Sequence, residues 1–109
     1  SDAKIHSMHA ILSDCCHIMA DLFDQHEITI LKSFEASQDR VNVDRDEVIQ
    51  AVTNLMRNSL HAITEVTRAS QGSIKGRLLM RTYQTGDQIA VEIEDNGVGI
   101  EQEHQIKLF

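Results

Sequence analysis

The sequence of 109 residues contains no proline and only five glycines. Without proline, the ends of helices and strands must be marked by glycine, asparagine and aspartate. A chain of this length is expected to form one domain, residues 1–109, with a modest hydrophobic core.

Basic residues are scarce, because 10 lysines and arginines stand against 17 acidic residues, giving a formal net charge of −7. This balance excludes a general electrostatic surface for nucleic acid. A polyphosphate ligand would have to be met by a counter-ion or by local hydrogen-bond donors. Mg²⁺, which prefers oxygen ligands, is the obvious counter-ion.

Long apolar runs are also missing. No stretch approaches the length that crosses a bilayer, and no basic segment followed by an apolar core opens the chain, so we expect no membrane span, no direct membrane contact and no signal peptide. The two cysteines, Cys15 and Cys16, are adjacent, which suits neither a zinc site nor an ordinary disulfide. These absences favour a cytoplasmic setting and leave open whether the full-length protein is membrane-anchored.

Apolar residues recur at spacings of three and four over residues 5–23, which predicts an amphipathic helix capped by Ser1 or Asp2. His6 and His9 are three residues apart on this helix and have no third metal ligand nearby. We therefore interpret both as surface histidines.

Residues 28–34 are rich in β-branched and aromatic side chains and predict a strand. A second helix is predicted after Asp44, because Asp44 and Glu47 have the spacing of a capping box, and Gly72 is a natural end for it.

Two strands over residues 77–83 and 88–94, joined by a turn with Gly86 and Asp87, predict a hairpin. The period of two places Asp95 on the same face as the apolar residues of the second strand. Helices on one side of a largely antiparallel sheet make an α+β fold, a two-layer sandwich.

A first chemical motif is the run Asn54-Leu55-Met56-Arg57-Asn58-Ser59, in which one helical turn separates the two asparagines. A carboxamide oxygen is a neutral, hard ligand for Mg²⁺, and its NH₂ group can donate to a phosphate. Such a pair could hold an ion and its phosphates together. Both residues could equally be ordinary polar residues that face water.

A second motif is the run Asp95-Asn96-Gly97-Val98-Gly99-Ile100. An aspartate in such a run is usually a turn residue. Here it ends an inward-facing apolar row, where its carboxylate needs a polar partner such as the exocyclic amine of adenine. Gly97 and Gly99 permit positive φ and a close approach of the backbone to a flat base.

Together the motifs resemble the N box and the G1 box of the ATP-binding domain shared by sensor histidine kinases, gyrase-type topoisomerases, the heat-shock chaperone ATPase and mismatch-repair ATPases. The resemblance implies that Asn58 coordinates Mg²⁺ between the phosphates of ATP and that Asp95 accepts a hydrogen bond from the adenine amine. The rest of the G1 box is matched by Gly97, Gly99 and Ile100.

One position favours a kinase over an ATPase. Hydrolytic members of the superfamily carry a glutamate four residues before the metal-binding asparagine, where it activates water. Asn54 stands there in this chain, and an amide cannot take a proton. His61 and Ala62 replace the lysine and aromatic residue of many histidine kinases, and the alanine resembles the nitrogen-regulation and dicarboxylate-sensor kinases. His61 could donate to a phosphate or be a solvated surface histidine.

The resemblance implies the ATP-binding catalytic domain of a two-component sensor histidine kinase. The full-length protein would transfer the γ-phosphoryl group of Mg-ATP to a histidine on its separate dimerisation domain, with a response regulator downstream. No residue of this chain is assigned a catalytic role.

The end of the sequence, Leu108-Phe109, resembles the start of the F box. We therefore expect the ATP lid, the G2 glycine motif and the strands that complete the sheet to lie beyond Phe109. By itself the chain is expected to be an incomplete domain with weak or undetectable nucleotide binding and no autophosphorylation.

Two alternatives stay open. A protein serine kinase of the anti-sigma or mitochondrial dehydrogenase-kinase kind shares both boxes, but it generally keeps an acidic base where Asn54 stands. A non-catalytic interaction module would instead use an exposed sheet edge and apolar surface to pair with a second copy, forming a homodimer.

Overall fold

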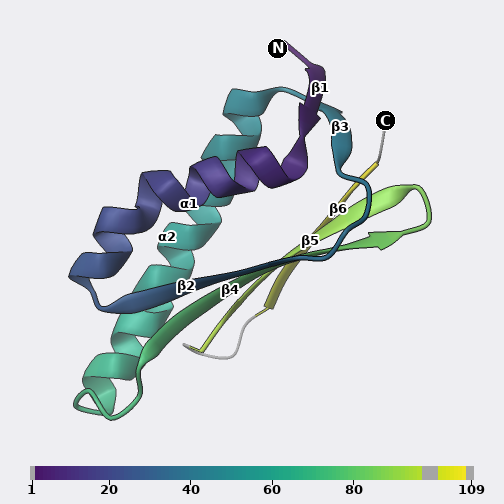
Figure 1. The fold of residues 1–109 in the computed structure, drawn as a ribbon. Coiled ribbons are helices and arrows are strands. Elements are labelled where there is room, and N and C mark those ends of the chain that lie inside the picture. The colour runs from purple at the N-terminus through teal and green to yellow at the C-terminus, as the bar shows by residue number, and fades with distance from the viewer. Residues whose placement is uncertain (1, 97–100, 108–109) are drawn as a thin grey trace.

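The computed structural model describes residues 2–96 and, as backbone, residues 101–107. In chain order its elements are β1 (Lys4–Ser7), α1 (Met8–Gln25), β2 (Ile28–Phe34), β3 (Arg40–Val43), α2 (Arg45–Ala69), β4 (Gly76–Thr85), β5 (Gln88–Asp95) and β6 (Glu101–Lys107). The two helices lie together on one face of a sheet made of β2, β4, β5 and β6 (Figure 1). This arrangement confirms the predicted α+β two-layer sandwich.

Helix α1 begins at Met8, whereas the sequence predicted a start at residue 5. Ser7 is the N-cap, and its side chain accepts a hydrogen bond from the backbone N–H of Ala10. Residues 4–7 form β1, which pairs antiparallel with β3. Neither strand was predicted, because their partners are distant in the sequence and hydrophobic periodicity reports only local order.

Helix α2 begins as predicted. Asp44 is the N-cap, and its carboxylate accepts a hydrogen bond from the backbone N–H of Glu47 at 3.2 Å. The helix ends at Ala69, and the following Gly72 has a positive φ of 82°. Its N–H donates to the carbonyl of Thr67 at 2.9 Å, which satisfies an acceptor at the end of the helix.

Strand β2 covers the predicted residues and pairs in parallel with β4, Ile28 opposite Gly76. The chain between them, which includes α2, therefore crosses over the sheet. The predicted hairpin forms from β4 and β5 with Gly86 at a positive φ of 60°. Strand β6 adds antiparallel to β5, in a segment for which the sequence predicted no strand.

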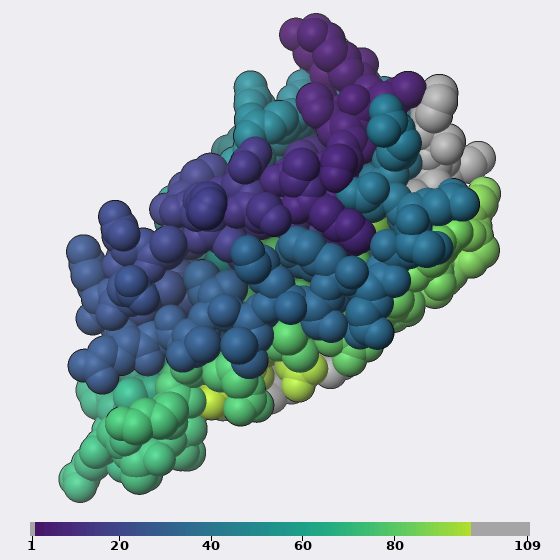
Figure 2. Space-filling view, in the orientation of Figure 1, coloured from purple at the N-terminus to yellow at the C-terminus, as the bar shows by residue number. Residues whose placement is uncertain are grey.

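The core lies between the helices and the sheet. Its largest fully buried side chains come from α1, α2, β3, β4 and β5, and they are Met8, Ile11, Leu12, Met19, Phe23, Val41, Met56, Ile63, Leu78, Met80, Ile89 and Ile93. Figure 2 shows α1 and the segment after it covering one side of the molecule. Among the described residues, no helix combines the length and the apolar character needed to cross a membrane.

Gly76 gives a test of how tightly the two layers pack. A Cβ atom at this position would lie 2.7 Å from Cγ2 of Ile63 and 2.9 Å from Cγ1 of Ile28. We expect Gly76→Ala to lower the free energy of unfolding by about 1–3 kcal/mol, because α2 and β2 must both move. Urea denaturation would measure the loss, with the exposed neighbour Lys75→Ala as control. Equal stability of the two variants would contradict the packing.

Candidate functional site

Asp95 lies at the end of the buried row of β5. Ile89 and Ile93 are fully buried on the side that faces the helices, and Asp95 is 8% exposed on the same side. In the hairpin it is paired opposite Leu78, which is also fully buried. The predicted face of Asp95 is therefore confirmed, and its carboxylate is held beside apolar side chains.

The residue after Asp95 fixes the backbone at this point. Asn96 accepts a hydrogen bond at Oδ1 from the backbone N–H of Arg77 at 2.9 Å, and its Nδ2 donates to the carbonyl of Lys75 at 2.5 Å. Its own N–H donates to the carbonyl of Arg77 at 3.3 Å. The side chain thus extends the β4–β5 pairing beyond the last strand residue. This role of Asn96 was not predicted from the sequence, although an asparagine side chain can bond a backbone donor and a backbone acceptor together.

The predicted residues of the N box lie on α2. Asn54, Asn58 and His61 are exposed, and Ala62 is half-buried. At about 100° per residue, Asn58 is turned roughly 200° from the fully buried Met56, so the pair lies on the side opposite the core. The asparagines of the predicted site are therefore on the solvent-facing side of α2, away from the sheet.

The remaining predicted residues, Gly97, Gly99 and Ile100, lie outside the described residues, as does Leu108-Phe109. The structure gives Asp95 a buried place in the sheet and Asn58 an exposed place on the helix above it. That the two side chains border one nucleotide cleft stays a prediction.

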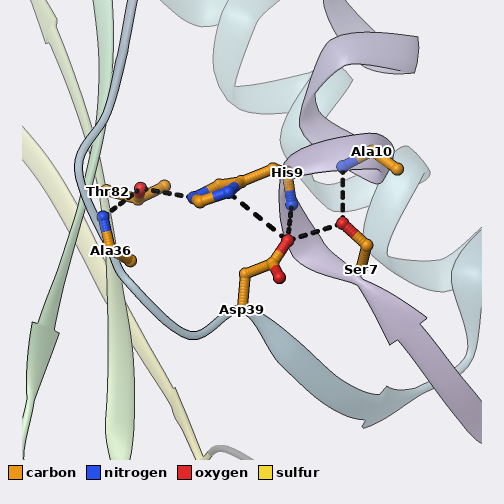
Figure 3. Close-up of polar contacts among 6 residues, drawn as sticks. All are labelled: Ser7, His9, Ala10, Ala36, Asp39 and Thr82. Atoms are coloured by element: carbon orange, nitrogen blue, oxygen red, sulfur yellow. Dashed lines mark hydrogen bonds and ion pairs between the residues drawn. The ribbon is translucent and has the colours of Figure 1, made fainter.

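His9 is not the surface histidine that the sequence predicted. Its Nε2 lies 2.7 Å from the hydroxyl of Thr82, and its Nδ1 lies 3.4 Å from a carboxylate oxygen of Asp39 (Figure 3). The ring stacks on Phe34 with centroids 4.8 Å apart. The backbone N–H of Ala36 donates to the same hydroxyl at 3.3 Å. This network joins the start of α1 to β4 and to the segment that follows β2.

Asp39 serves as a second cap for α1. Its carboxylate accepts hydrogen bonds from the hydroxyl of Ser7 at 2.5 Å and from the backbone N–H of His9 at 2.9 Å. Burial alone would raise the pKa of Asp39, but these two hydrogen bonds and the nearby charges of His9 and Arg40 hold the pKa below its ordinary value. The ionised carboxylate is therefore part of the native state.

Both cysteines are buried and free, in agreement with the prediction that they form no disulfide. Burial, with smaller contributions from Cys16 and Asp14, raises the pKa of Cys15 to about 11. Burial also raises the pKa of Cys16. Neither thiol is set up as a nucleophile, because the thiolate is the reactive form.

Comparison with known proteins gives one family. A family model described as histidine kinase-, DNA gyrase B- and HSP90-like ATPase matches residues 43–109. The chain is 27% identical over 104 residues to the signal transduction histidine-protein kinase AtoS of Escherichia coli K12, covering 94% of this chain and 16% of AtoS. It is 35% identical over 66 residues to the nitrogen regulation protein NtrY of Azorhizobium caulinodans, covering 61% of this chain and 8% of NtrY. It thus spans a small part of either relative.

The fold is similar to that of solved histidine kinases. A nucleotide-free catalytic domain of the histidine kinase ThkA aligns with a TM-score of 0.71 at 17% identity, over 92% of this chain and 62% of that chain. ThkA in complex with the response regulator protein TrrA aligns with a TM-score of 0.73 at 15% identity, over 90% of this chain and 27% of that chain. At such identities the likeness concerns the fold alone.

The cap at Asp39 should make stability depend on pH. We expect Asp39→Ala to lower the free energy of unfolding by about 1–3 kcal/mol at pH 7, because it removes hydrogen bonds to a charged acceptor. The native pKa lies below the unfolded value of about 3.9, so the contribution is complete above that pH and is lost as the pH falls through the native pKa.

Urea denaturation of the unsubstituted protein and of Asp39→Ala, at several pH values between 7 and 3, would measure how their difference in unfolding free energy changes with pH. The exposed Asp21 of α1 serves as control, because Asp21→Ala should leave stability nearly unchanged throughout. A penalty for Asp39→Ala that stays constant down to pH 3 would contradict the role of the ionised carboxylate.

Proposed function

We propose that this chain, which belongs to the family of histidine kinase-, DNA gyrase B- and HSP90-like ATPases, supplies the adenine and phosphate contacts in the ATP-binding domain of a sensor histidine kinase. The full-length protein transfers the γ-phosphoryl group of ATP to a histidine on its own dimerisation domain. The observation on which this rests is the buried Asp95 at the end of β5, followed by a residue that fixes the backbone.

The adenine end of the site is Asp95. A carboxylate held at the edge of an apolar core is suited to a flat base with one polar amine, because the core side chains contact the ring and the carboxylate accepts from the amine. The clamp by Asn96 keeps the carboxylate in position before the ligand arrives. Gly97, Gly99 and Ile100 complete this end in the proposal.

The phosphate end is the exposed side of α2. Among the described residues there is no group of three histidine, cysteine, aspartate or glutamate side chains that could hold a metal ion. A magnesium ion that arrives with ATP does not need such a group, because it keeps water and phosphate oxygens as ligands. The amide oxygen of Asn58 fits as its protein ligand. Magnesium would supply charge neutralisation at the phosphates.

The amide of Asn54 favours phosphoryl transfer to a protein over hydrolysis of ATP. With an amide at this position, no carboxylate is present on this turn of α2 to activate a water molecule. The residues then bind and orient ATP, and the acceptor histidine supplies its own nucleophile. His61 and Ala62 follow on the next turn, and the proposal gives His61 the role of a donor to a phosphate.

The partners follow from this role. ThkA is solved in complex with the response regulator protein TrrA. We propose that a response regulator likewise receives the phosphoryl group from the full-length protein that contains this chain, and that the ATP-binding domain is cytoplasmic.

Replacing the adenine contact should weaken binding of all adenine ligands. In the intact kinase domain that contains this chain, Asp95→Asn should raise the Kd of a non-hydrolysable ATP analogue and of adenosine by about 10-fold or more, because a charged acceptor is lost. Calorimetry would measure both. Glu94→Gln, whose side chain faces the other side of the sheet, is the control. Unchanged adenosine binding in a folded Asp95→Asn protein would refute the adenine assignment.

Replacing the metal contact should act differently. Asn58→Ala should leave adenosine binding unchanged and should abolish most of the gain in ATP affinity that Mg²⁺ provides, because the amide ligand is gone. Titrations of the ATP analogue with and without Mg²⁺ would measure that gain. Gln50→Ala, which removes another exposed amide of α2, should keep it. A full magnesium effect in Asn58→Ala would rule out this ligand.

A further inference from the structure

Arg57 stands between the two asparagines of α2 and makes no ion pair with any described residue. Three other arginines of the described chain do have carboxylate partners. Arg45 pairs with Asp14 at 2.5 Å, Arg68 pairs with Glu65, and Arg81 lies 3.6 Å from Glu92. The chain has a net charge of −7, so an arginine whose charge is not paired with a carboxylate of the described residues is suited to bind an anionic ligand.

The contact that Arg57 does make is with a neutral group. Its Nη1 donates to Oδ1 of Asn54 at 3.3 Å. Because a guanidinium group can only donate, the atom that it contacts is the amide oxygen. One of the two lone pairs of that oxygen is then occupied, while the NH₂ group of Asn54, which can only donate, remains for a ligand.

Four polar residues form one ridge on the exposed side of α2. Asn54, Arg57, Asn58 and His61 follow the spacing i, i+3, i+4 and i+7, and all four are exposed. Residues at these spacings are neighbours on a helix surface. The ridge therefore combines donors that suit phosphate with the amide oxygen of Asn58, which suits a metal ion.

Resting on the function proposed above, we propose that Arg57 is a phosphate-binding residue that also positions Asn54. The guanidinium group contributes a permanent positive charge at the phosphates of ATP, and its hydrogen bond turns the NH₂ group of Asn54 towards them. Asn58 remains as the amide whose oxygen faces the metal ion. The two asparagines thus have different roles, one as donor and one as metal ligand.

Arg68 is a matched control within the same helix. It is exposed, and it donates to the residue three positions earlier, as Arg57 does, but its acceptor is the carboxylate of Glu65. If the contact of Arg57 served only to stabilise α2, the two arginines would respond alike to substitution. A role towards phosphate separates them, because of these two arginines only Arg68 has its charge paired with a carboxylate of the described residues.

The experiment compares Arg57→Gln, Arg57→Lys and Arg68→Gln in the intact kinase domain. The probes are a non-hydrolysable ATP analogue with Mg²⁺, and adenosine. Arg57→Gln should raise the Kd of the ATP analogue by about 10-fold and leave that of adenosine unchanged. Arg57→Lys should recover part of the loss, since it keeps the charge without the fork of donors. Thermal unfolding would show that all three variants are folded.

The outcomes separate this inference from the proposed function. Suppose that Arg57→Gln and Arg68→Gln have the same Kd for the ATP analogue, while Asn58→Ala and Asp95→Asn still weaken ATP binding. That result would overturn the role of Arg57 and leave the proposed function standing. If no substitution at Asp95, Asn58 or Arg57 changes ATP binding, both the role of Arg57 and the proposed function are refuted. Equal weakening of ATP and adenosine by Arg57→Gln would also overturn the inference, because it would show a loss away from the phosphates.

Discussion

The pairing register between β4 and β5 is the constraint on which the rest of the site depends. Because side chains alternate along a strand, a slip of one residue would move Asp95 from the helix-facing side to the outer side of the sheet. The register is fixed at one end by the turn at Gly86 and at the other by the hydrogen bonds of Asn96. Apolar packing of Ile89 and Ile93 against the helices opposes any slip between these points.

The two sides of helix α2 differ in burial and in residue type. Its buried side, with Met56 and Ile63, packs on the sheet, while the opposite side presents the polar ridge that begins at Asn54 and ends at His61. A rigid helix that is fixed by core packing holds its exposed side chains more precisely than a loop would. Polar side chains can therefore stand on the exposed ridge without disturbing the packing of the core.

Local signals in the sequence predicted what local interactions decide. The cap at Asp44, strand β2, the hairpin turn and the buried face of Asp95 all follow from residues close together in the chain. Strands β1, β3 and β6 were not predicted. Strands β1 and β3 pair with each other although α1 and β2 lie between them in the sequence, and the segment of β6 lacks hydrophobic alternation. His9 was misread because its partners come from three other segments.

The same distinction applies to the site. The types and spacing of Asn54, Asn58 and Asp95 were sufficient to propose a nucleotide site, because the residue types themselves carry the chemistry. Arg57 and Asn96 were not singled out, because their importance lies in hydrogen bonds that the sequence alone does not predict. The parallel pairing of β2 with β4 also sets the order in which parts of the core can form during synthesis on the ribosome. Since β2 finds its partner only after α2 and β4 have emerged, the sheet face that covers the apolar stripe of α1 forms late, and the nascent chain exposes that stripe until then.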